Sequence, residues 1–144
     1  MSDLHIEDFY RDVALIFSQL YASFPRKVIL YVDDISGPDN PDEFGLHSER
    51  FLACFSAMVW LAEQGYLQYD AAIRQEALDQ VVLTERGFLL LSSRSELALG
   101  EPSNDDLPNS IMEQSLSNIV QLRNAIQSGS SITIKQCVHY LLSK

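Results

Sequence analysis

The stretch from Trp60 to Leu91, WLAEQGYLQYDAAIRQEALDQVVLTERGFLLL, decides the fold that we expect for this chain. Gly65 allows the helix before it to end in a left-handed turn. Residues 66–69 alternate as a half-buried strand does, and residues 81–83 form a second short β-type run. Thr84 predicts the start of another helix, because its hydroxyl can accept hydrogen bonds from the first helical turn.

The segments around this stretch predict a helix, a strand and a connection. Residues 70–80 are polar and lack glycine, so we expect the tip between the two strands to be a turn or a short helical segment. Over residues 6–24 apolar side chains recur at steps of three and four, which is typical of an amphipathic helix. Pro25 is expected to end that helix. The apolar, β-branched run 28–32 predicts a buried strand.

Residues 33–64 predict a loop followed by a helix. The segment 33–45 holds glycine, proline, asparagine and several acids, a composition typical of a surface loop. Ser48 can cap a helix that runs to about Gln64. Apolar residues cover most of the circumference of this helix, so we expect it to be buried on nearly all sides.

The C-terminal third predicts a connector and two helices. Residues 95–108 are rich in turn formers and indicate a connector. A capping-box pattern predicts a helix over 110–128, and Ser131 can cap a last helix. The expected organisation is therefore a first domain over 1–94 and a C-terminal helical extension over 109–143, packed as one unit.

Two local patterns resemble a winged helix. Residues 57–67, AMVWLAEQGYL, are similar to the end of a recognition helix that runs into its wing. Residues 82–91, VLTERGFLLL, resemble the LT-x-x-G-x-x-x-L segment of MarR-like and PadR-like bacterial regulators. The resemblance implies an α+β, mostly helical fold. It would be a winged helix-turn-helix with a small antiparallel β-wing and two additional C-terminal helices.

The net charge of this chain disfavours DNA binding, which is the usual function of that fold. It has 20 acidic and 10 basic residues, a formal net charge of −10, which disfavours nucleic acid and anionic membranes. A DNA-binding regulator remains the alternative function, and its candidate DNA contacts are the scattered bases Arg26, Lys27, Arg50 and Arg74. The N-terminus shows no secretory leader, so we expect a cytoplasmic location.

Enzymatic and metal-binding functions have weak support. There is no glycine-rich phosphate loop and no Gly-x-Ser-x-Gly motif, so we expect neither catalysis nor a cofactor. The three histidines show no metal-ligand spacing, and we expect no metal site. The acidic residues of the 33–45 segment lack the ligand spacing of a calcium loop; they are Asp33, Asp34, Asp39, Asp42 and Glu43. Cys54 and Cys137 are expected to be buried thiols, although a disulfide between them is also compatible with the sequence.

The C-terminal helices suggest a partner. Apolar residues repeat along the predicted helix over 110–128, and PadR-like proteins dimerise through a C-terminal helix, so the resemblance suggests a homodimer. The candidate self-association residues are Met112, Leu116, Ile119, Leu122 and Ile126. A helical hairpin packed on its own domain explains the same pattern equally well. The first hypothesis is therefore a non-enzymatic winged-helix module that binds another protein or itself.

Overall fold

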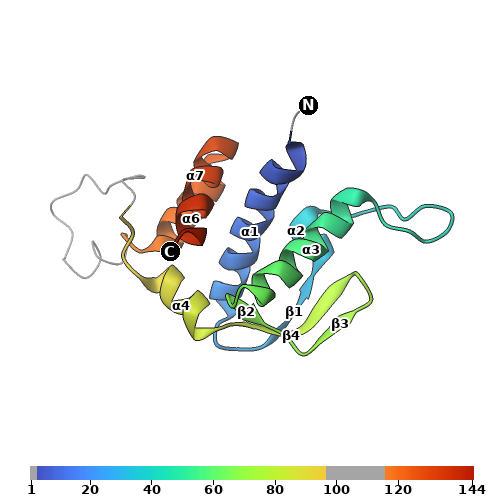
Figure 1. Cartoon of the computed structure of the whole chain (residues 1–144), viewed down its shortest axis with the longest axis horizontal. Helices are drawn as coiled ribbons and strands as arrows, with labels where there is room; N and C mark the ends of the chain where they lie inside the picture. Colours follow the sequence, from blue (N-terminus) through green and yellow to red (C-terminus); the bar gives the residue numbers. More distant parts are fainter. Residues whose placement is uncertain (1–2, 97–115) are drawn as a thin grey trace.

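A long N-terminal helix is the centre of the molecule. The computed structural model describes residues 3–96 and 116–144, and its first helix, α1, spans Leu4–Ser23. Figure 1 shows α1 between α3 on one side and the helices α6 and α7 on the other, and it contacts all three. Because neighbours cover it on several sides, α1 has a wide buried face that includes Ile16, Phe17 and Leu20.

A small antiparallel sheet lies against the helices. It contains β1 (Val28–Tyr31), β2 (Leu67–Gln68), β3 (Ala71–Ile73) and β4 (Ala77–Leu83). The seven-residue strand β4 pairs with β1 along one edge and with β2 and β3 along the other. β3 and β4 form a β-hairpin, with Arg74 at a positive φ of 52° in its turn.

The turn expected within residues 70–80 is present, but most of the segment around it is strand. These residues contain β3, a turn over 74–76 and the first part of β4. The three residues of β3 are all exposed, so they carry no alternating apolar pattern. Backbone pairing with β4, such as Ala71 opposite Asp79, holds them in the sheet, and periodicity cannot reveal such a strand.

The segment after β1 begins with a helix, which corrects the expected loop. α2 spans Val32–Ser36 and buries Val32 and Ile35. These two residues are three apart, so they lie on one face of the helix. The remaining residues, 37–48, connect α2 to α3 and are called the α2–α3 loop below.

The central helix α3 spans Glu49–Glu63, and its boundaries confirm two predictions. The side chain of Ser48 accepts a hydrogen bond from the backbone N–H of Phe51, and Gly65 has a positive φ of 85° after the end of the helix. The expectation of burial on nearly all sides was wrong. α3 buries one face, with Cys54 and Met58 at 0 % exposure, whereas Trp60 on another face is 37 % exposed.

Three further helices complete the fold. α4 spans Glu85–Ser92, and the hydroxyl of Thr84 accepts from the N–H of Gly87, as predicted. α6 spans Asn118–Ser128 and begins at Ser117, while the predicted start near Ser110 lies outside the described residues. α7 spans Ser131–Leu142, and its cap is Ser130 rather than Ser131.

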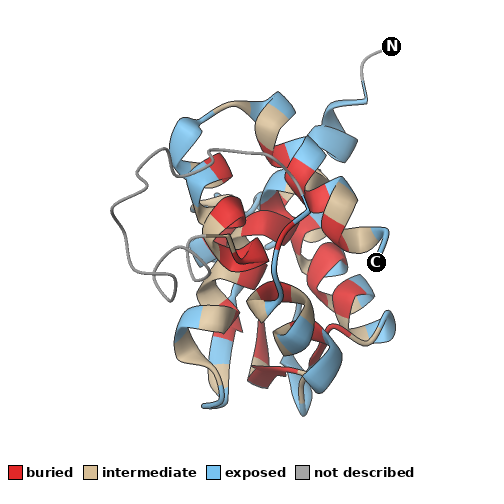
Figure 2. Cartoon of the chain, turned by 90° about the vertical axis from the view of Figure 1, so that its left-hand side faces the viewer, coloured by how far each residue is buried: buried red, intermediate tan, exposed pale blue. Residues whose placement is uncertain are grey.

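The C-terminal helices belong to the same core as the rest. Leu122 of α6 and Leu141 of α7 join a single cluster of buried residues with Phe17 of α1 and Met58 of α3. Figure 2 shows this buried interior running through the helices and into the sheet. In the described part of the chain, none of the helices combines the length and the apolar character needed to cross a membrane.

Candidate functional site

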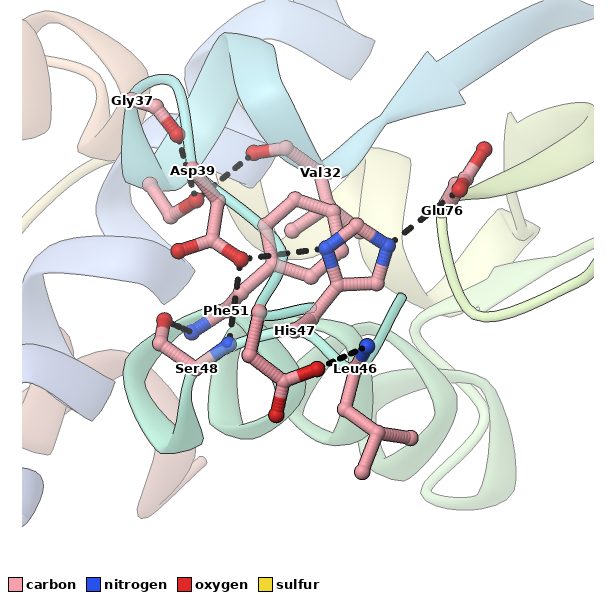
Figure 3. Close-up of polar contacts among 10 residues, drawn as sticks. Val32, Gly37, Asp39, Leu46, His47, Ser48, Phe51 and Glu76 are labelled. Atoms are coloured by element: carbon pink, nitrogen blue, oxygen red, sulfur yellow. Dashed lines mark hydrogen bonds and ion pairs between the residues drawn. The ribbon is translucent and has the colours of Figure 1, made fainter. Parts of the chain in front are cut away.

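The α2–α3 loop is tied to the β3–β4 hairpin by a histidine between two carboxylates. The Nδ1 atom of His47 lies 3.0 Å from Oδ2 of Asp39, and its Nε2 atom lies 3.2 Å from Oε1 of Glu76. The ring also stacks on Phe51, with 4.0 Å between ring centroids. Figure 3 shows the imidazole between the two acids and over the phenyl ring. The loop therefore has a fixed position relative to the hairpin.

The same contacts shift two pKa values. Partial burial lowers the pKa of His47, but the hydrogen bonds and negative charges of Asp39 and Glu76 outweigh this effect and raise the pKa above 6.5. The backbone N–H of Ser48 donates to Asp39 at 3.0 Å, and this bond, with the His47 ring, lowers the pKa of Asp39. The charged forms of both groups are therefore favoured in the folded protein.

The His47 contacts predict a pH dependence. Because the pKa of His47 is raised in the folded state, its contribution to stability is complete below 6.5 and is lost as the pH rises through the raised value. We expect E76Q to lower the midpoint of the His47 ring titration, measured by NMR. E85Q removes a carboxylate from α4 instead and should leave the midpoint unchanged. Equal midpoints in E76Q and the wild type would contradict the bridge to Glu76.

A hydrogen-bonded turn in the loop carries two exposed apolar side chains. The Oδ1 atom of Asp42 accepts from the backbone N–H groups of Phe44 and Leu46, each at 2.9 Å. The backbone N–H of Asp42 donates to the carbonyl of Leu46, also at 2.9 Å. Despite this order, Phe44 is 79 % exposed and Leu46 is 64 % exposed. The turn thus holds both side chains in solvent.

The sheet that His47 joins to the loop also has exposed apolar side chains. Tyr31 of β1 and Ile73 of β3 both lie opposite Ala77 of β4, and residues opposite one another in a sheet project from the same face. Tyr31 is 47 % exposed and Ile73 is 41 % exposed. Glu76, which precedes Ala77, is the hydrogen-bond partner of His47. We call Phe44 and Leu46, with the loop acids around them and the hairpin residue Glu76 that His47 contacts, the loop–hairpin face.

Arg50, one of the four predicted DNA contacts, is used inside the protein. Its two terminal nitrogens donate to the carboxylate of Asp12 at 2.6 and 2.7 Å, and its Nε atom lies 3.6 Å from Asp8. Asp12 is 1 % exposed, and the ion pair joins the start of α3 to α1. The guanidinium that was predicted as a DNA contact is therefore occupied by an internal ion pair, because burying Asp12 requires such a partner.

The other three predicted DNA contacts do not form a stripe. Arg26 and Lys27 precede the end of β1 that pairs with Val81, whereas Arg74 lies beyond the end that pairs with Ala77. These ends are roughly 13 Å apart along the sheet at the usual rise of about 3.3 Å per residue. Lys27 also borders a groove with Asp79 and Asp70, which reduces its attraction for phosphate.

The predicted self-association residues differ in how far they are buried. Ile119 is 3 % and Leu122 0 % exposed, in the chain's own core, so neither is available to a second chain. Leu116 and Ile126 are half-buried. Met112 lies outside the described residues. The helical hairpin packed on its own domain is the arrangement that the structure has.

The two cysteines are buried, and His139 has a hydrogen-bond contact away from His47 in the sequence. Cys54 and Cys137 are both free and buried, and burial raises their pKa to about 12 and about 11. His139 contacts the hydroxyl of Tyr10 at 3.3 Å, far along the chain from His47. No three His, Cys, Asp or Glu side chains of residues 3–96 and 116–144 are arranged to hold a metal ion.

Sequence reasoning missed the apolar part of the loop–hairpin face. The sequence predicts a surface loop over 33–45, and it assigns no role to Phe44 or to Leu46 just after it. Their signal is an apolar pair at alternate positions inside an otherwise polar, proline-containing loop, preceded by an aspartate that can form a turn. Glu76 gave no signal, because it is 29 positions from His47 in the sequence.

Compared with models of protein families, with curated proteins and with solved structures, the chain matches none.

Proposed function

We propose that this protein is a winged-helix module that binds a partner protein through its loop–hairpin face. The winged-helix assignment is supported by the order α1, β1, α2, α3, β2, β3, β4. It is also supported by the pairing of β1 with the second strand of the hairpin, the pairing expected if the hairpin is a wing. A fold alone does not assign a function, so the proposal depends on the chemistry of the face.

The observation that carries the proposal is that a hydrogen-bonded turn exposes Phe44 and Leu46 among carboxylates. Large apolar side chains held in water by an ordered turn gain free energy when a partner covers them, about 1.5–3 kcal/mol for each fully buried side chain. The acids around them, such as Asp42 and Glu43, attract a positively charged surface. The partner therefore has basic residues around an apolar recess.

Charge argues against a second copy of the chain as the occupant. Each copy has a formal net charge of −10 and would bring the same loop acids to the contact. Like charges facing each other across an interface cost several kcal/mol. We therefore propose a partner of opposite charge.

A peptide titration tests the face. The probe is a fluorescent peptide of alternating lysine and leucine, and the comparison peptides replace lysine with glutamate or leucine with serine. We expect the wild type to bind the lysine–leucine peptide alone. F44S/L46S should bind it at least about tenfold more weakly, the loss that corresponds to about 1.4 kcal/mol.

The matched control removes an apolar side chain elsewhere. Ile132 on α7 is 68 % exposed and lies outside the loop–hairpin face, so I132S should bind like the wild type. Equal binding by F44S/L46S and I132S would exclude the face as the site. Equal binding of the glutamate–leucine peptide would exclude the charge argument.

The alternative function, a DNA-binding regulator, has a separate test. Arg50 is paired with Asp12, and the remaining candidates are dispersed, so we expect no binding to mixed genomic fragments at low or moderate salt. Binding whose affinity falls steeply with salt would show phosphate contacts and would replace the proposed function.

A further inference from the structure

A separate cleft lies between α4, the start of α6 and the end of α7. Its volume is about 440 Å³, which falls in the range of small-ligand sites. Residues of the described part that line it include Tyr66, Arg86, Leu89, Arg94, Asn118 and Tyr140. α4, α6 and α7 lie at the opposite side of the molecule from the α2–α3 loop (Figure 1). The cleft is therefore independent of the loop–hairpin face.

Positive charge is concentrated in this cleft. Arg86, Arg94 and Lys144, three of the 10 basic residues in an acidic protein, line it, with Glu96 as the acid among its lining residues. Lys144 is paired with Glu96 at 2.8 Å. Within the described part of the chain the guanidinium of Arg94 has no ion-pair partner. The cleft thus offers a free cation to an acidic ligand.

Arg86 is held in position beside it. Its Nη1 atom donates to the carbonyl of Gln64 at 2.7 Å, and its Nη2 atom donates to the hydroxyl of Tyr66 at 3.1 Å. The guanidinium also lies 4.4 Å from the centre of the Tyr66 ring. Two neutral acceptors leave its charge uncompensated, so Arg86 adds to the attraction for an anion.

A buried acceptor borders the same cleft. Asn118 is 4 % exposed, and its amide nitrogen donates to the carbonyl of Leu90 at 2.7 Å. Its Oδ1 atom is buried without a hydrogen-bond partner among the described residues. The backbone N–H of Asn118 donates to Ser93 at 2.8 Å, which fixes the residue against the end of α4. A buried acceptor without a donor costs about 1–3 kcal/mol, and a ligand N–H group that reached it from the cleft would satisfy it.

We propose that this cleft binds an N-acylated α-amino acid with an apolar side chain. Such a ligand has a carboxylate for Arg94 and Arg86 and an adjacent amide N–H for Oδ1 of Asn118. Its apolar side chain suits Leu89, which is 50 % exposed. A free acylated amino acid and the C-terminal residue of a polypeptide both have this chemistry.

Calorimetric titration of the full chain tests the proposal with four probes. They are N-acetyl-L-leucine, N-acetyl-L-leucinamide, and a short peptide that ends in leucine with a free or an amidated carboxyl group. We expect both free carboxylates to bind and both amides to fail. If only the free-carboxylate peptide binds, the source is a polypeptide; comparable binding of N-acetyl-L-leucine shows that the small acid suffices. Absence of binding by all four probes overturns the proposal, as does equal binding of the amides.

Variants locate the site. R94Q changes an exposed side chain and should weaken binding of the free carboxylates about tenfold or more, because it removes a charge-assisted contact. N118L removes the acceptor and should weaken binding too, with its melting temperature measured to detect loss of folding. R74Q removes an exposed arginine from the hairpin and should bind like the wild type. Equal effects of R94Q and R74Q would show attraction by overall charge only, and would overturn the proposed site.

Discussion

The R50M variant is expected to lose about 3–5 kcal/mol of unfolding free energy at neutral pH, the usual cost of leaving one member of a buried ion pair without its partner. The side chain of Asp12 is only 2 % exposed, against 32 % for Arg50, so a methionine at position 50 would cover the carboxylate without offering it a donor. Urea unfolding followed by circular dichroism measures the loss. Burial raises the pKa of Asp12 even beside Arg50, so the loss should shrink in acid, where the carboxyl takes up a proton.

The double variant D12L/R50M tests whether the loss in R50M comes from the unpaired charge of Asp12 or from the lost packing of the arginine side chain. Replacing both members with apolar residues removes the buried charge together with its partner, and such replacements are often neutral or stabilising. We therefore expect D12L/R50M to be more stable than R50M. R26M, which removes an exposed arginine from the turn after α1, should behave like the wild type. If R50M loses less than about 1 kcal/mol, or D12L/R50M is no more stable than R50M, Asp12 does not depend on Arg50.

The helix boundaries were predictable because their causes are local. Ser48 and Thr84 accept from backbone N–H groups three residues later, and Gly65 supplies the positive φ that follows α3. Each signal is complete within a few residues of sequence. For the same reason α1, α3, α4 and α7 lie close to where the sequence places them.

Features that depend on partners far along the chain were not predictable. Arg50 was grouped with surface bases because its partner Asp12 is 38 positions away. β3 has no apolar pattern and exists through its pairing with β4. The apolar repeat of α6 suits a dimer contact and an internal contact equally, and the positions of α1, α4 and α7 beside it decide between them.

The candidate site also contains both features that local sequence predicts and features that depend on distant partners. Asp42 and the turn it forms could be expected from local sequence, since aspartate commonly binds backbone N–H groups two residues ahead. The tie between His47 and Glu76 could not, because it needs the hairpin to fold back beside the α2–α3 loop. The acidic charge predicted that nucleic acid is a disfavoured partner. It did not point to Phe44 and Leu46, because the composition of the segment around them is mainly polar and acidic.

Gly87 shows why the LT-x-x-G pattern has its glycine. A Cβ atom at this position would lie 2.1 Å from the carbonyl oxygen of Tyr66 and 3.2 Å from a methyl group of Leu83. The carbonyl of Tyr66 also accepts from the backbone N–H of Thr84 at 3.1 Å, so it cannot move without breaking the junction of β2 and α4. The glycine is needed for this close approach of helix and backbone.

We expect G87A to lower the unfolding free energy by about 2 kcal/mol or more. Alanine favours a helix over glycine by about 1 kcal/mol, but overpacking against immobile atoms costs about 1–3 kcal/mol and sometimes more, and here the nearest atom belongs to the backbone. Urea unfolding gives the value. S92A, at the end of the same helix, should change stability by less than about 0.5 kcal/mol. A G87A protein as stable as the wild type would mean that α4 can move away from Tyr66, and the close approach would then not be the reason for the glycine.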